Sequence, residues 1–225
     1  MALNKQKKGN MYGFITDSWN PIRGICLHRC KYCYARRVQS QWGVVSLNEK
    51  CLNDKLGKQR SIFVGSSTDM WGRWVSPANI RQVLTYCQKF NSNSYLFQTK
   101  NPERFYKFRK IGLPTIAIYG TTIETTNEKL SLEISKAPSV WYRYADLADL
   151  NMPKKMVSLE PIMDFSVSTM IRWLFYIRPS FVSIGADSKN HHLPEPPAEK
   201  IKELIAELQK FTEVKIKPNL TRLMG

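Results

Sequence analysis

Acidic residues are scarce in this chain. Its 225 residues include 18 Asp and Glu against 34 Lys and Arg, which gives a formal charge of +16 at pH 7 and a pI near 9.7. A field of this sign attracts polyanions and speeds their encounter with the protein. Nucleic acid is the commonest such partner, and aromatic side chains at 12% of the residues offer stacking surfaces for unpaired bases. The charge favours a nucleic-acid partner but does not identify a substrate.

Long apolar runs are also missing, since no stretch approaches the ~20 residues that span a bilayer. The basic residues 1–10 are not followed by an apolar segment, so we expect no secretory signal and no membrane partner. We find no internal repeat, low-complexity tract or linker, and 43% of the residues are hydrophobic. The length fits one domain over residues 1–225 with a basic N-terminal segment. We expect it to be cytoplasmic.

Cysteine is infrequent, yet three of the five cysteines, Cys26, Cys30 and Cys33, share one segment with the spacing C-x3-C-x2-C. Three thiolates on one loop can hold three corners of a cubic iron–sulfur cluster and leave the fourth iron free to bind another molecule. Structural zinc usually takes paired C-x2-C units, and no second pair is present. Cys51 and Cys87 stand alone, which argues against a disulfide framework. The pattern favours an open [4Fe-4S] cluster, with zinc as the alternative.

The cysteine spacing, with Tyr32 directly before the third cysteine, resembles the motif of radical S-adenosylmethionine enzymes. In that superfamily the open iron chelates the amino and carboxylate groups of S-adenosylmethionine. Reductive cleavage of the cofactor then gives a 5′-deoxyadenosyl radical, which abstracts a hydrogen atom from the substrate. The resemblance implies a [4Fe-4S] cluster and S-adenosylmethionine as cofactors, and an external electron donor such as flavodoxin or ferredoxin.

Short β-type runs alternate with amphipathic helical stretches along the chain. The runs are Met11–Thr16, Ser61–Gly65, Ser94–Gln98, Thr115–Gly120, Lys155–Leu159, Phe181–Gly185 and Glu213–Lys217. Such an alternation implies a parallel sheet with right-handed crossovers. A full eightfold barrel usually needs about 250 residues. The sequence therefore predicts an α/β fold, an open partial (β/α)6-type barrel of mostly parallel strands, with the cysteine loop after the first strand.

Helix starts are readable from capping residues between these runs. The predicted starts are Ser76 with Pro77, Asn101 with Pro102, Thr125 or Thr126, Ser166, and Pro197. The third of these helices has to end before Pro138. The segment Val140–Leu150 fits neither a helix nor a strand template.

Polar residues follow the predicted strands, at the ends where βα barrels carry their chemistry. Helix caps explain the serines and threonines among them but explain Lys100, Glu124 and Glu160 poorly. The segments are Trp19-Asn20-Pro21, Gly65-Ser66-Ser67-Thr68-Asp69, Gln98-Thr99-Lys100, Thr121-Thr122-Ile123-Glu124, Ser158-Leu159-Glu160-Pro161, Gly185-Ala186-Asp187-Ser188 and Lys217-Pro218-Asn219.

The order of these motifs, together with Cys33-Tyr34-Ala35 and Asn101-Pro102-Glu103-Arg104, resembles the phage Gp37/Gp68-type family of radical S-adenosylmethionine-like proteins, a domain of unknown function. The resemblance covers roughly residues 12–187. That family typically carries Gly-Gly-Glu-Ser near the sixth strand, where this chain has Ile184-Gly185-Ala186-Asp187. The resemblance implies a fold and cofactors, and no substrate.

The resemblance also suggests roles for single residues. Cys26, Cys30 and Cys33 would ligate the cluster, Tyr32 would help to seat the adenine, and the Gly65-Ser66-Ser67 turn, with Asp69 nearby, would receive the amino group of the cofactor. Thr122 and Glu124 are candidates for the ribose hydroxyls, and Arg36 either meets the cofactor carboxylate or lies on the surface. Glu160 and Lys100 are predicted to touch substrate or cofactor, and Cys51 is a candidate hydrogen-atom donor. A metal site at Asp187, His191 and His192 is a weaker alternative.

The sequence thus predicts a radical S-adenosylmethionine enzyme that modifies or repairs nucleic acid. The same chemistry on a peptide or small molecule, and a nucleic-acid-binding module with a structural metal site, are the alternatives. A base attacked inside a barrel has to be unpaired or flipped, so we expect single-stranded or distorted nucleic acid. One plausible basic cluster for it comprises Arg104, Lys107, Arg109 and Lys110.

Overall fold

The computed structural model describes residues 3–6, 11–109 and 112–225. By its internal contacts the chain divides into two compact units. The first comprises Met1–Arg29 and Cys33–Tyr119, and the second comprises Cys30–Tyr32 and Gly120–Gly225. The boundary therefore passes twice through the cysteine loop. The prediction of a single domain over residues 1–225 stays a prediction.

The described residues form an open eight-stranded sheet with β1 and β10 at its edges, in the order β1-β2-β5-β6-β7-β8-β9-β10. Pairing is antiparallel between β1 and β2 and parallel for β2–β5, β5–β6, β8–β9 and β9–β10. The strands are β1 (Leu3–Lys5), β2 (Asp17–Trp19), β5 (Ser61–Val64), β6 (Ser94–Thr99), β7 (Ala117–Thr122), β8 (Lys155–Leu159), β9 (Phe181–Ile184) and β10 (Glu213–Ile216). A short ribbon pairs β3 (Ile22–Arg23) with β4 (Ser46–Leu47). The predicted α/β class with a mostly parallel, open sheet is confirmed.

The first unit packs its helices against aromatic side chains. In α2 (Pro77–Gln88), Tyr86 stacks on the fully buried Trp19 of β2 at a ring distance of 5.4 Å. The buried Trp71 lies edge-on to Phe105 of α3 (Glu103–Phe108), 4.7 Å between ring centres. The unit also contains the short α1 (Arg36–Gln39) and a 3-10 helix, η1 (Glu49–Asn53). These contacts fix the strands whose ends carry the polar residues.

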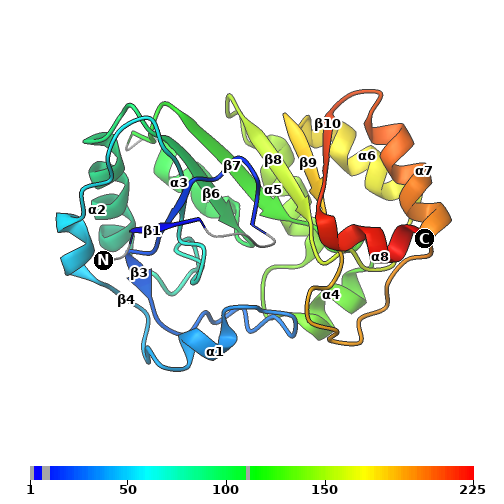
Figure 1. The fold of residues 1–225 in the computed structure, drawn as a ribbon, viewed down its shortest axis with the longest axis horizontal. Helices are drawn as coiled ribbons and strands as arrows, with labels where there is room; N and C mark the ends of the chain where they lie inside the picture. The colour runs from blue at the N-terminus through cyan, green and yellow to red at the C-terminus, as the bar shows by residue number, and fades with distance from the viewer. Residues whose placement is uncertain (1–2, 7–10, 110–111) are drawn as a thin grey trace. The chain divides into compact units, whose positions relative to one another are not determined.

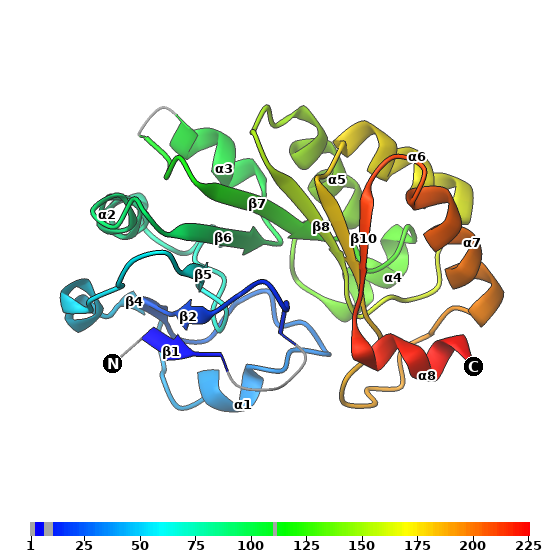
Figure 2. The same ribbon diagram turned by 45° about the horizontal axis from the view of Figure 1, so that its top comes forward.

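In the second unit, α5 (Val140–Asp149), α6 (Val167–Ile177) and α7 (Ala198–Leu208) lie side by side along β8, β9 and β10 (Figures 1 and 2). All four residues of β9 are buried, as expected for a parallel strand covered on both faces. The remaining helices are α4 (Glu128–Ile134), the 3-10 helix η3 (Pro218–Leu220) and α8 (Thr221–Met224). Within the described residues, no helix is long and apolar enough to cross a membrane.

The predicted strands are largely confirmed, with β8 matched at both ends. The first is wrong, because Gly13 and Phe14 form a turn, with the N–H of Ile15 bonded to the Tyr12 carbonyl, and the strand begins only at Asp17. The run Thr115–Gly120 is displaced, since a bend at its first two residues delays β7 to Ala117–Thr122.

The helix starts at Ser76, Ser166 and Pro197 are confirmed, and both serine hydroxyls accept the expected capping hydrogen bond. The start at Thr125 or Thr126 is wrong. Asn127 caps α4, while the two threonine hydroxyls bond to the Asp164 carbonyl and the Ser166 N–H. The predicted cap at Asn101 is also wrong, because its side chain donates to the Trp71 carbonyl and Pro102 is the N-cap of α3. The segment Val140–Leu150, for which the sequence predicts no element, contains α5.

Candidate functional site

The cysteine loop follows β2, the first strand with a parallel partner, as the sequence predicts. The five cysteines lie outside any disulfide. Cys26 and Cys33 are half-buried, and Cys30 is buried. Cys26 and Cys33 belong to the first unit, whereas Cys30 and Tyr32 belong to the second. The contacts of the loop therefore fall into two sets, one in each unit.

In the first unit, the carboxamide of Gln39 holds the loop. Gln39 ends α1 and is only 5% exposed. Its Oε1 accepts a hydrogen bond from the N–H of Cys26 (3.3 Å), and its Nε2 donates to the carbonyl of Ser67 (2.5 Å). The same Nε2 lies 3.9 Å from the sulfur of Cys33 and donates to it. One amide thus joins two predicted cluster ligands to the predicted cofactor turn. Gln39 is not among the residues that the sequence predicts at the site.

A second link runs from His28, inside the cysteine loop, to Asp69. His28 Nε2 lies 2.8 Å from Asp69 Oδ2, and both side chains are almost completely buried. The same oxygen accepts hydrogen bonds from the Thr99 hydroxyl (2.8 Å) and the Lys100 N–H (3.0 Å). Burial by itself raises the pKa of the Asp69 carboxyl, but the hydrogen bonds from His28, Lys100 and Thr99 outweigh it, so that this pKa lies below its usual value. Asp69 therefore anchors the loop as a carboxylate.

The turn after β5 is built around Asn20, from the motif that leads into the cysteine loop. Asn20 Oδ1 accepts hydrogen bonds from the Ser67 N–H (3.0 Å) and the Ser66 hydroxyl (3.2 Å). Gly65 has φ = +78°, a conformation that favours glycine. The Ser66 carbonyl accepts from the Tyr34 hydroxyl. The turn is therefore a defined structure that presents two backbone carbonyls.

In the second unit, residues 30–32 are fixed by three contacts. The sulfur of Cys30 lies 3.2 Å from the hydroxyl oxygen of Ser135, and the N–H of Lys31 donates to the carbonyl of Ile134 (2.8 Å). The hydroxyl of Tyr32 donates to the carboxylate of Glu124. The structure thus brings together Tyr32 and Glu124, two residues that the sequence predicts at the cofactor.

Glu124 belongs to a fully buried ion pair with Arg143 of α5. Arg143 Nη1 lies 2.7 Å from Glu124 Oε2, and neither side chain is exposed. The guanidinium also donates to the Thr122 carbonyl (2.7 Å) and the Ser131 hydroxyl (2.8 Å). Tyr32 and Arg143 engage the two oxygens of Glu124, so direct contact with a ribose would require one oxygen to be released. Thr122, the other predicted ribose contact, is 6% exposed.

Glu160, predicted to touch substrate or cofactor, pairs with Lys217, which follows β10. Lys217 Nζ lies 2.7 Å from Glu160 Oε2, and the side chains of Lys217 and Glu160 are 9% and 18% exposed. Lys100 belongs to the first unit, where its backbone joins the Asp69 network. The structure therefore does not bring Lys100 and Glu160 together within one unit.

The other predicted residues have simpler surroundings. Cys51 is buried on η1, and this burial raises the pKa of its thiol, so it stays protonated near neutral pH. Arg36 is exposed and donates to the Arg29 carbonyl (3.5 Å). Asp187 accepts a hydrogen bond from the His191 ring (2.7 Å).

The predicted basic cluster on the helix after Lys100 is partly wrong. Arg104 is buried, donates to the Val75 carbonyl (2.8 Å) and lies over the Phe108 ring, so it cannot face a polyanion. Lys107 is exposed and pairs with Glu103 (2.6 Å), and Arg109 is exposed. Lys110 lies outside the described residues.

The thiols fit an iron–sulfur cluster by the chemistry of the donor set. Within the part of the chain that the structure describes, no three His, Cys, Asp or Glu side chains meet closely enough to hold one metal ion. A cubic cluster binds each cysteine to a different iron, so its ligands stand farther apart than those around a single ion. Three thiols on one short loop, with polar side chains beside Cys30 and Cys33, are the type of donor that such a cluster takes.

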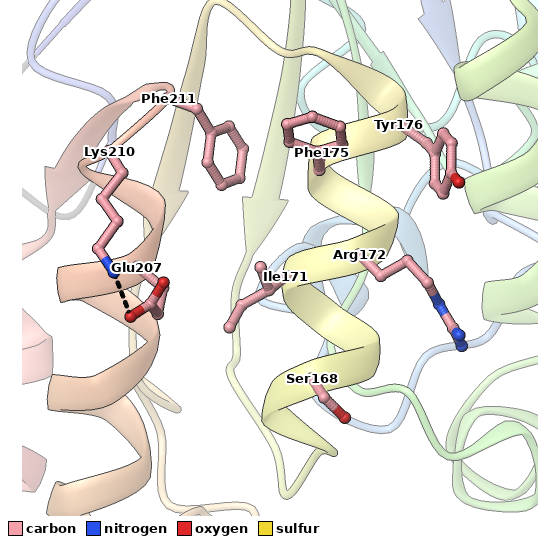
Figure 3. Close-up of a pocket in the computed structure, with 8 residues that line it drawn as sticks. All are labelled: Ser168, Ile171, Arg172, Phe175, Tyr176, Glu207, Lys210 and Phe211. Atoms are coloured by element: carbon pink, nitrogen blue, oxygen red, sulfur yellow. Dashed lines mark hydrogen bonds and ion pairs between the residues drawn. The ribbon is translucent and has the colours of Figure 1, made fainter.

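A groove in the second unit contains none of the predicted site residues. It lies between α6 and α7, where Phe175 and Phe211 face each other over Ile171 (Figure 3). Lys210, at its rim, is paired with Glu207 (2.6 Å). The groove is a surface feature of the outer helices.

Comparison with solved structures finds the same fold in two kinds of protein. Spore photoproduct lyase complexed with dinucleoside spore photoproduct gives a TM-score of 0.64 at 10% identity, covering 93% of this chain and 78% of the lyase. A lyase variant with bound AdoMet and dinucleoside spore photoproduct gives 0.58 at 12% identity, covering 91% and 64%. HydG, a maturase of the [FeFe]-hydrogenase, gives 0.58 at 13% identity, covering 88% and 50%. At these identities, the likeness shows a common fold.

No curated protein matches the sequence significantly. The resemblance to the phage Gp37/Gp68-type family stays a prediction. A family model described as protein of unknown function (DUF5131) matches residues 11–191, which is most of the chain. This protein therefore belongs to the DUF5131 family.

Proposed function

We propose that this protein is a radical S-adenosylmethionine enzyme whose [4Fe-4S] cluster is held by Cys26, Cys30 and Cys33. The observation that carries the proposal is one loop with three cysteines outside any disulfide, spaced C-x3-C-x2-C, which follows β2, the first strand with a parallel partner. The fold supports it, because the lyase that shares this fold has been solved with AdoMet bound. When bound, the cluster supplies the electron that cleaves S-adenosylmethionine to the radical that abstracts hydrogen from substrate.

In this proposal the chain's own residues hold and orient the cofactors. Gln39 fixes Cys26 and Cys33 relative to the Ser67 carbonyl, one of the backbone oxygens proposed to receive the amino group of S-adenosylmethionine. Asp69 fixes the loop through His28. Tyr32 is proposed to lie beside the adenine, with its hydroxyl oriented by Glu124. Arg36, Thr122 and Glu124 stay candidates for contact with the cofactor.

We further propose that the substrate is a nucleic acid that is modified or repaired. The charge of +16 supports a polyanion, and the lyase of the same fold has been solved in complex with dinucleoside spore photoproduct. Cysteines outside any disulfide suit a reducing compartment, so we propose a cytoplasmic protein served by an electron donor such as flavodoxin or ferredoxin. Lys100, Glu160 and Cys51 stay candidates for substrate contact or hydrogen-atom return. The alternatives are a peptide or small-molecule substrate and a binding module with a structural metal.

The test begins with anaerobic reconstitution, followed by measurement of iron and sulfide per chain and of 5′-deoxyadenosine after reduction with S-adenosylmethionine. We expect a brown protein with about four irons and slow cofactor cleavage without substrate. A colourless protein that binds one zinc ion would contradict the proposal. Binding of DNA and RNA over a salt series then tests the substrate class, since phosphate contacts weaken steeply with salt.

A further inference from the structure

Three polar side chains of the second unit meet where β8, β9 and β10 end. Glu160 follows β8, Gly185 follows β9, and Lys217 and Asn219 follow β10. The strands are parallel neighbours, β8 to β9 and β9 to β10, so these residues share the carboxyl edge of the sheet. Ligands of α/β folds bind outside this edge.

Gly185 leaves the space in which the side chains of Glu160 and Asn219 come close together. A Cβ on this residue would lie 3.0 Å from the Glu160 carboxylate and 3.1 Å from Asn219 Oδ1, closer than ordinary van der Waals contact. The carboxylate therefore lies directly over the glycine, between β8 and β10. From β10, Lys217 Nζ reaches the same carboxylate at 2.7 Å. The result is an ammonium donor beside a carboxylate acceptor at the carboxyl edge of the sheet, with Glu160 half-buried and Lys217 buried.

Asn219 makes the region richer in acceptors. Its Nδ2 is fixed by the Ala186 carbonyl (2.6 Å) and the Ser188 hydroxyl (3.0 Å). Its Oδ1 is therefore directed toward Gly185 and Glu160, where it is buried and accepts no hydrogen bond from the described residues. Two acceptors beside one ammonium group suit a ligand that offers N–H groups next to a carbonyl oxygen.

We propose that Glu160, Lys217 and Asn219 form a subsite for the edge of a keto nucleobase, one that presents a ring N–H beside a carbonyl. Lys217 donates to the carbonyl oxygen, and Glu160 accepts from the ring N–H. Uracil, thymine and guanine present this pair, and the 2-amino group of guanine can also meet Asn219. Neutral cytosine and adenine lack the ring N–H on that edge. This inference rests on the proposed nucleic-acid substrate.

The adjacent donor and acceptor of this subsite fit a nucleobase better than a peptide group. A trans peptide group directs its C=O and N–H to opposite sides, so one group cannot meet both members of an adjacent donor–acceptor pair. A ring lactam holds its C=O and N–H in cis, side by side. The pairing of Lys217 with Glu160 at 2.7 Å thus favours a base edge over an extended peptide.

The test uses reconstituted holoprotein and single-stranded pentanucleotides that differ only at the central base, uracil or cytosine, between deoxyadenosines. Uracil and cytosine have nearly the same size, so the comparison isolates the hydrogen-bonding edge from stacking. Because a good pair of base contacts discriminates between bases, we expect roughly tenfold tighter binding of the uracil strand by fluorescence anisotropy at fixed salt. Central guanine should behave like uracil, and central adenine like cytosine.

Lys217→Met and Glu160→Leu should abolish the preference for uracil. Lys215→Met is the matched control: it removes one positive charge from β10, where Lys215 pairs with Glu213, and it should weaken both strands equally without changing their ratio. Gly185→Ala keeps every functional group but displaces the carboxylate, and it should also reduce the ratio. Circular dichroism of each variant shows whether it folds.

Equal binding of the uracil and cytosine strands by the wild-type protein, or a preference that survives Lys217→Met, would overturn the inference. Absence of binding to every strand, in a protein that cleaves S-adenosylmethionine, would overturn both the inference and the nucleic-acid substrate, leaving the radical chemistry intact. A protein without an iron–sulfur cluster that still prefers uracil through Lys217 would overturn the proposed chemistry and support the subsite.

Discussion

Replacing Glu124 by alanine is expected to destabilise the second unit, beyond any effect on cofactor binding. Glu124 and Arg143 form an ion pair with both side chains fully buried, 2.7 Å apart. The change leaves the guanidinium without its counter-charge, although its bonds to the Thr122 carbonyl and the Ser131 hydroxyl persist. It also removes the acceptor of the Tyr32 hydroxyl, which helps to hold residues 30–32.

The size of the effect follows from the burial. Removing one partner of a buried pair costs about 3–5 kcal/mol, because the remaining charge is buried and uncompensated. Natural domains are stable by only about 5–15 kcal/mol, so the loss is a large part of the total. With a urea m-value of about 2–3 kcal/mol/M, the unfolding midpoint should fall by about 1 to 2.5 M. Glu133→Ala, on the exposed face of α4, should change stability by less than about 0.5 kcal/mol.

The assay is urea unfolding followed by circular dichroism, with iron content measured in parallel. A double variant, Glu124→Leu with Arg143→Met, separates the pair from its surroundings, because apolar replacement of both partners is often close to neutral. We expect the double variant to be more stable than Glu124→Ala by at least about 2 kcal/mol. A loss below about 1 kcal/mol in Glu124→Ala, or a double variant that is no more stable than Glu124→Ala, would refute this reasoning.

Three further predictions concern the cysteine loop and the carboxylate of Asp187. Cys30→Ala should lose the cluster and all cofactor cleavage, whereas Cys51→Ala should keep its iron. Full iron content in Cys30→Ala would contradict the role of Cys30 as a cluster ligand. Gln39→Leu should keep iron but lower the cluster's reduction potential, because an N–H donor to the Cys33 sulfur is lost; an unchanged potential in a redox titration followed by EPR would count against it. Burial raises the pKa of the Asp187 carboxyl, but hydrogen bonds from the His191 ring and from the backbone N–H groups of His191 and Lys189 lower it more, so this pKa lies below its usual value. The stability that these hydrogen bonds contribute is therefore present above about pH 4 and is lost as the pH falls below that. In thermal unfolding, Asp187→Asn should therefore be less stable than the wild type at pH 7 and approach its stability at pH 3. A difference in stability that is the same at both pH values would contradict the lowered pKa of Asp187.

The local signals in the sequence determined most of the sheet and the cysteine loop. β8 was predicted at both ends because its apolar run is bounded by turn residues on each side. Ser76 and Ser166 were found because a capping hydroxyl acts within three residues of its own position. The spacing of the three cysteines is local as well, and so it was readable without knowledge of what surrounds the loop.

The helix α5 shows where local reasoning fails. Its buried residues include Val140, Arg143 and Leu147, and an arginine within an apolar stripe disrupts the expected period. Arg143 can be buried only because Glu124, which follows a different strand, neutralises it. No window of sequence around α5 contains that information.

The same reason explains what the sequence and the tertiary structure each determined about the candidate site. The sequence indicated which residues could ligate a cluster and which polar residues end each strand. The tertiary structure decided their partners: Gln39 with Ser67, Asp69 with His28, and Glu160 with Lys217. A hydrogen bond or ion pair requires two groups at about 3 Å, and for residues far apart in the chain that distance is set by the packing of the strands between them.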